Sequence, residues 1–193
     1  MNPLTSVKGS IVTAFVLAAI VSVCLSILAG SDLGAYPQIG RVLHIVAGVM
    51  WIGLLYYFNV VQVPGLADAA ADKGGPGGAG ISKYIAPRAL LWFRWAAVVT
   101  WITGAYYLAF GYGSTKVLHQ AFMLEPGFRI IGVGAWLGTI MLFNVWVFIW
   151  PNQKKILGIV PATDEQKAKA RKSALYASRT NFILSVPMLM CMG

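Results

Sequence analysis

The chain has 193 residues, of which 58% are hydrophobic and only 11% are charged. A soluble domain carries roughly a quarter charged residues, so this composition excludes an ordinary soluble protein and indicates an integral membrane domain. The formal net charge of +9 does not indicate nucleic-acid binding, because the basic residues cluster beside apolar runs, where they fix topology and contact anionic lipid.

Five apolar runs predict five transmembrane helices in a single domain that covers residues 1–193. A hydrocarbon core of about 30 Å requires about 20 helical residues, and the first run is too long for the apolar region of a signal peptide. A further helix, capped at Thr163, is expected to lie along the membrane surface. We therefore predict an all-α, polytopic transmembrane helix bundle. The predicted spans are 11–30, 42–63, 88–113, 129–150 and 176–193, and the surface helix is 164–175.

The distribution of Lys and Arg predicts the topology. With five spans, eleven of these residues fall on the side of the N-terminus and three, Arg41, Lys116 and Arg129, fall on the opposite side. By the positive-inside rule the N-terminus is cytoplasmic, and we expect a multi-pass protein of a bacterial inner membrane.

The helix at 42–63 carries polar residues along one face. His44, Gly48, Trp51, Asn59 and Gln62 recur at helical spacing among Val, Ile, Leu, Met and aromatic residues. Because polar groups are costly in lipid, this face should point into protein.

His44 and His119, the two histidines, both fall toward the outer side. A neutral imidazole between helices is a good axial ligand for haem iron, with Gly48 leaving room for a flat macrocycle and Trp51 forming its floor. We predict b-type haem at His44, with His119 as a weaker candidate ligand. The alternative is a His44 that only bonds a neighbouring helix and a His119 that is solvated in a loop.

Arg94 lies one to two turns inside the helix at 88–113. Arginine at this depth either snorkels to the interface or meets an anion. One hypothesis is that Arg94, Asn59 and Gln62 bind a planar anionic substrate at a cytoplasmic-side cavity, since guanidinium and amide groups suit such a ligand. The alternative is hydrogen bonding between helices.

Four features favour neighbouring subunits. The Gly-rich segment DKGGPGGAG needs something to pack against, the last apolar run is interrupted by Pro187 and barely spans a membrane, and Gly134 and Gly138 suit close helix approach. The fourth is that Cys24 and Cys191 form no CxxCH motif, so no covalent haem of a c-type cytochrome can attach here. We expect a lipid bilayer, other membrane subunits or a cytochrome c as partners, or a longer chain.

Three runs carry a resemblance to a known family: HIVAGVMWIGLLYYFNVVQVP, APRALLWFRWAAVVTWITGAYYL and RTNFILSVPMLM. From about Arg41 onward the chain resembles the membrane domain of bacterial cytochrome c-type urate oxidase, the urate oxidase N-terminal domain family. The spacing of His44, Trp51 and Gly53 is also similar, more loosely, to bacterial membrane protoporphyrinogen oxidase. The urate family implies oxidation of urate, with electrons passed to a fused cytochrome c domain that these residues lack.

Two classes of function follow. The first is a urate-oxidase-like redox domain that binds haem and passes electrons to a separate or missing cytochrome c. The second is a non-catalytic accessory subunit of a larger membrane complex. A transporter is less favoured, since the sequence has no internal repeat or pair of broken helices.

Overall fold

The computed structural model describes residues 5–30 and 36–192, and throughout these residues the chain is helical or in short connections. Within these described residues, three helices are long and apolar enough to cross a membrane: Val7–Ala29, Gln38–Ala71 and Arg129–Ile156. The all-α class predicted from composition is therefore confirmed for the described part of the chain.

The helical elements form six continuous stretches. The first is α1 (Val7–Ala29), and the second joins α2 (Tyr36–Tyr56), a π-helical turn (Tyr57–Gln62) and α3 (Val63–Ala71). The third joins a π-helical turn (Ile81–Ile85) to α4 (Ala86–Phe110), and the fourth is the short α5 (Lys116–Phe122). The fifth joins α6 (Arg129–Phe143), a π-helical turn (Asn144–Ile149) and α7 (Trp150–Ile156), and the last is α8 (Asp164–Met190).

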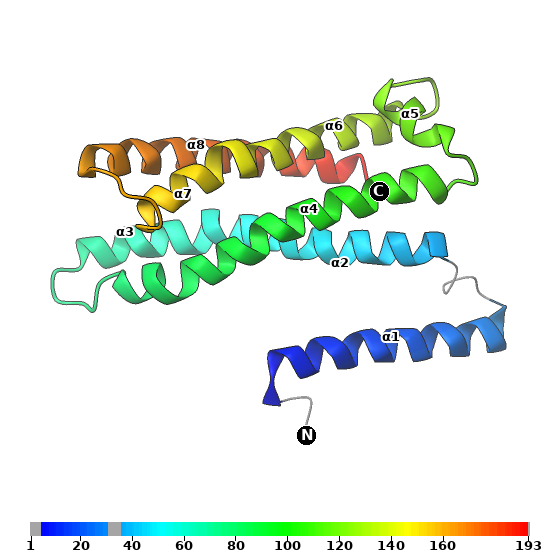
Figure 1. Ribbon diagram of the computed structural model, residues 1–193, viewed down its shortest axis with the longest axis horizontal. Helices are drawn as coiled ribbons and strands as arrows, with labels where there is room; N and C mark the ends of the chain where they lie inside the picture. The colour runs from blue at the N-terminus through cyan, green and yellow to red at the C-terminus, as the bar shows by residue number, and fades with distance from the viewer. Residues whose placement is uncertain (1–4, 31–35, 193) are drawn as a thin grey trace.

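The stretches containing α2, α4, α6 and α8 pack along one another, while α1 lies apart from them (Figure 1). Their shared core is made of apolar side chains from each helix, with Trp51, Leu55, Phe93 and Met141 among the most buried. None of the residues of α1 is buried. The packed helices therefore form the core without α1.

The predicted surface helix and the predicted last span are one helix. Asp164–Met190 is continuous over 27 residues, so the residues expected at the surface extend the final helix instead of lying apart from it. At about 1.5 Å per residue its length is roughly 40 Å, but its first turns carry charged residues, and among the described helices it is not one of those apolar enough to cross a membrane. Gly193 lies outside the described residues.

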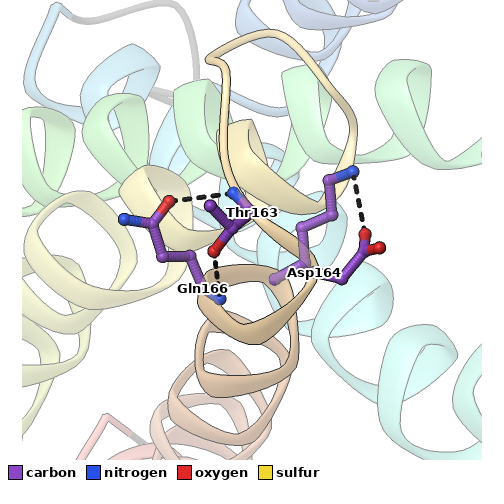
Figure 2. A network of polar contacts seen from close by, with 4 residues as sticks. Thr163, Asp164 and Gln166 are labelled. Atoms are coloured by element: carbon purple, nitrogen blue, oxygen red, sulfur yellow. Dashed lines mark hydrogen bonds and ion pairs between the residues drawn. The ribbon is translucent and has the colours of Figure 1, made fainter.

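The predicted cap of this helix is confirmed. The Thr163 hydroxyl accepts from the Gln166 N–H at 3.2 Å, while the Gln166 side chain accepts from the Thr163 N–H at 2.9 Å (Figure 2). The Lys167 Nζ lies 3.5 Å from the Asp164 Oδ1, an ion pair within the first turn. These reciprocal bonds satisfy N–H groups that the first helical turn leaves free.

Each of the three π-helical turns precedes a proline, and this corrects one predicted boundary. Pro64, Pro87 and Pro151 each lie two residues after such a turn, and the helix continues past all of them. A proline cannot donate to residue i−4 and its ring crowds that carbonyl, whereas a π turn enlarges the preceding turn and makes room. Pro151 therefore does not end the helix expected at 129–150, which runs on to Ile156.

Candidate functional site

A cavity of about 450 Å³ lies between α2, α4, α6 and the end of α8, and we call it the His44 cavity. Such a volume falls in the range of small-molecule and cofactor pockets. Its lining is mostly aromatic and apolar. The residues that matter for its chemistry are Arg41, His44, Trp51, Tyr107, Met188 and Met192.

One ring nitrogen of His44 is hydrogen-bonded to the protein backbone. Nδ1 lies 2.7 Å from the backbone oxygen of Thr100 on α4, and since a carbonyl only accepts, Nδ1 must carry the proton. In the neutral ring this leaves Nε2 with a free lone pair. Within the described residues Nε2 has no protein hydrogen-bond partner. A backbone carbonyl on one ring nitrogen and an open second nitrogen is the arrangement found in metal-binding histidines.

The absence of a side chain at Gly104 leaves space for the imidazole of His44. A Cβ added to Gly104 would stand 2.7 Å from Cε1 and 2.9 Å from Nδ1 of His44, closer than real atoms approach. The edge of the ring that carries Cε1 and Nδ1 thus packs against the backbone of α4, and only glycine leaves the space. Gly48, predicted to make room for a macrocycle, instead faces the methyl of Thr100 at 3.7 Å and does not line the cavity.

Trp51 brings an unpaired donor to the same cavity. Its side chain is only 2% exposed, and its Nε1–H has no partner among the described residues. By contrast, Trp101, which also lines the cavity, donates to the Thr139 hydroxyl at 2.8 Å. A buried N–H without a partner costs free energy, so a ligand with an acceptor would be stabilised at Trp51.

His119 is placed elsewhere. It lies on the exposed part of α5 and does not line the cavity, so the two histidines are not brought together. Among the described residues, no group of three or more His, Cys, Asp or Glu side chains is close enough to hold a metal ion. The donors near His44 are instead the thioethers of Met188 and Met192, which the sequence analysis did not single out.

The three residues predicted to bind a substrate are only partly brought together. Gln62 lines a second cavity, and Asn59 donates to the hydroxyl of Ser178, which also lines it, at 2.9 Å. Arg94 does not line this cavity, because its guanidinium stacks on the ring of Trp150, with Cζ 3.8 Å from the ring centroid. This cation–π contact gives the charge a partner inside the protein.

Two of the features expected to need a neighbour are explained within the chain. The Asp72 carboxylate accepts from the Gly74 N–H at 3.1 Å, and Gly78 is packed against Leu66, so the Gly-rich segment is held by α3. Gly134 lies against Cys191, and Gly138 opens onto the His44 cavity.

A family model described as "Urate oxidase N-terminal" matches residues 116–193. This segment contains the motif RTNFILSVPMLM and supplies α6 and α8 to the His44 cavity, whereas the two earlier motifs precede it. No match was found among curated proteins or among solved structures. Over residues 116–193 the chain is therefore similar to the urate oxidase N-terminal family, the family that the sequence resemblance predicted.

Proposed function

We propose that this chain is an integral membrane redox domain that holds a b-type haem in the His44 cavity. The observation that carries the proposal is the state of His44, whose Nδ1 is bonded to Thr100 and whose Nε2 is left open beside a cavity. Met188 and Met192, which also line the cavity, would offer soft thioether donors to the haem, and His/Met pairs are known haem ligands. The unpaired Trp51 N–H suits a polar edge or carboxylate of the macrocycle.

In this proposal the chain forms a five-span bundle with a cytoplasmic N-terminus. Only α1, α2–α3 and α6–α7 are apolar enough to be recognised as spans, but α4 packs against α2 and α8 packs against α6 and α7. Helices so paired would cross the bilayer together, since their backbone bonds are satisfied internally. The His44 cavity then lies toward the outer side and the basic residues of α8 on the cytoplasmic side.

When bound, the haem would supply a one-electron carrier between a reduced substrate, urate in the family resemblance, and an oxidised cytochrome c on another chain. The residues of this chain fix the imidazole through Thr100 and Gly104 and exclude water with aromatic walls. No CxxCH motif is present in the sequence, so the acceptor has to be a separate cytochrome or a separate domain.

The experiment is a haem titration of the purified protein in detergent, followed by its Soret band. We expect a saturable band in the wild type and in His119→Ala, and its loss in His44→Ala. His119→Ala is a matched control because it removes an imidazole that does not line the cavity. A wild type without the band, or His44→Ala with a wild-type band, would contradict the proposal.

Recognition of urate by Arg94, Asn59 and Gln62 is a separate proposal. Arg94 can still donate from its edges while stacked on Trp150, and the Oδ1 of Asn59 and Oε1 of Gln62 are without partners among the described residues. Calorimetry with urate tests it. Unchanged urate binding by Arg94→Ala eliminates the role of Arg94.

A non-catalytic subunit of a larger membrane assembly is the second candidate. The exposed α1 favours it, because a 23-residue apolar helix without buried residues offers its whole surface to neighbours or lipid. Light scattering of the purified protein in mild detergent measures the assembly directly. A monodisperse monomer would contradict this candidate.

A further inference from the structure

The second cavity, of about 750 Å³, lies at the other end of the same helices, and we call it the basic cavity. Its lining comes from both sides of the Gly-rich segment, from α4, from the end of α7 and from the first half of α8. Lys83 and Arg171 line it, and no Asp or Glu is among its described lining residues. It therefore presents uncompensated positive charge.

All three π-helical turns border this cavity. The turn Tyr57–Gln62 contributes Phe58 and Gln62, the turn Ile81–Ile85 contributes Ser82 and Lys83, and the turn Asn144–Ile149 contributes Ile149. Prolines explain how each turn forms, but not why three of them fall around one space. π-helical turns are rare and occur frequently at functional sites.

Two buried acceptors near the cavity have no partner among the described residues. The Oε1 atom of Gln62, which lines the cavity, is inaccessible and unbonded. The side chain of Asn59 is 2% exposed, and its Nδ2 donates to Leu55 and Ser178 while its Oδ1 is left unpaired. Both oxygens are closed off from the cavity, so the exposed cations and the apolar walls decide which ligand fits.

The walls between these polar groups are apolar. Leu90 and Phe93 of α4, Ile149, and Leu157 after α7 line the cavity. A ligand that matches this lining is anionic at one end and has a long apolar portion. In a membrane protein the cytoplasmic leaflet supplies molecules of this chemistry, and basic pockets between helices bind their head groups.

We propose that the basic cavity is a binding site for an anionic lipid, with Lys83 and Arg171 contacting the phosphate of its head group. The inference depends on the membrane location in the proposed function but not on haem. The site is distinct from the His44 cavity, with which it shares no lining residue.

The test is native mass spectrometry of the full chain in detergent, titrated with phosphatidylglycerol, phosphatidylcholine and phosphatidylethanolamine. We expect phosphatidylglycerol to bind roughly tenfold more tightly than the two zwitterionic lipids, the preference that two cations near an anionic head group give. Glycerol 3-phosphate at millimolar concentration separates the head group from the whole lipid. If it displaces the lipid fully, the site binds free phosphate esters and the lipid proposal is overturned.

Two double variants with the same change in charge complete the test. Lys83→Ala/Arg171→Ala should lose the preference for phosphatidylglycerol, while Lys73→Ala/Arg179→Ala should keep it, because Lys73 and Arg179 do not line the cavity. Equal loss in both would mean general attraction of basic residues to anionic lipid, and no loss in either would mean binding elsewhere; each overturns the proposal. A normal Soret band in the first variant shows that it is folded, and an absent band in the wild type leaves the lipid result valid.

Discussion

The His44 cavity and the basic cavity lie between the same packed helices, yet they differ in what they leave unpaired. At the His44 cavity the unpaired groups are the Nε2 lone pair and the Trp51 N–H, and the walls are aromatic. At the basic cavity they are the buried amide oxygen of Gln62 and the cations Lys83 and Arg171. The same set of helices can therefore form two cavities that fit different ligands. This is possible because polar residues on α2 and its π-helical extension occur at both ends of one helix face.

The largest effect is expected from a substitution that fills one of the two cavities. Gly138 on α6 lines the His44 cavity, and a Cβ built there meets nothing within 4 Å. Gly138→Phe should therefore abolish haem binding and leave phosphatidylglycerol binding at wild-type affinity. Gly53→Phe is the control, since Gly53 is exposed and also has open space. The readouts are the Soret band and native mass spectrometry, and loss of both ligands in Gly138→Phe would mean that the cavities are not independent.

A smaller effect is expected from moving the imidazole without removing it. In Gly104→Ala the new methyl would overlap the His44 ring, so the Nδ1 bond to Thr100 would be lost and haem affinity should fall about 10- to 100-fold, as in other losses of groups that orient a ligand. The matched variant is Gly48→Ala, whose methyl would make an ordinary 3.7 Å contact with Thr100 and should change little. Equal affinities for the two variants in the haem titration would show that the position of the ring is unimportant.

A third change should act on both cavities alike. Asn181 on α8 is fully buried; it donates to the Met141 carbonyl at 2.9 Å and accepts from Asn144 at 2.9 Å. Asn181→Ala should lower the free energy of unfolding by about 2 kcal/mol, since it leaves buried groups on α6 and the following turn unpaired. Denaturant unfolding in micelles measures this, with the exposed Thr180→Ala as control. An unfolding midpoint equal to that of the control would mean that these bonds do not hold α8 in place.

The sequence predicted where helices begin better than it predicted whether they continue past a proline. Apolar runs and the Thr163 cap are local signals, so the helix starts near Arg129 and Asp164 were found. The continuation past Pro151 was missed because a proline normally ends a helix, and the enlarged turn before it depends on packing. The available signal was that Pro64 and Pro151 each follow a long apolar run.

The site was predicted in part, for a physical reason. His44 and Trp51 share one helix face, so periodicity alone placed both toward the same space. Gly104, Gly138 and Met188 lie on other helices, and no spacing within one segment reveals which residues a partner helix brings to His44. The same limit applies to Arg94, whose stacking on Trp150 joins residues of two separate stretches.

The smallest effect on ligand affinity is expected when the Trp51 N–H is removed and an aromatic ring is kept. Trp51→Phe keeps an aromatic ring in the core but removes the unpaired donor. If a ligand in the His44 cavity accepts from this N–H, affinity should fall by about 2- to 10-fold, the equivalent of one hydrogen bond, while phosphatidylglycerol binding stays unchanged. Trp101→Phe is the informative partner, because the Trp101 N–H already donates to Thr139 and its removal should affect helix packing more than ligand affinity. We therefore expect haem titration to show the larger loss for Trp51→Phe and denaturant unfolding to show the larger loss for Trp101→Phe. If the same variant shows the larger loss in both measurements, Trp51 acts only as a core residue.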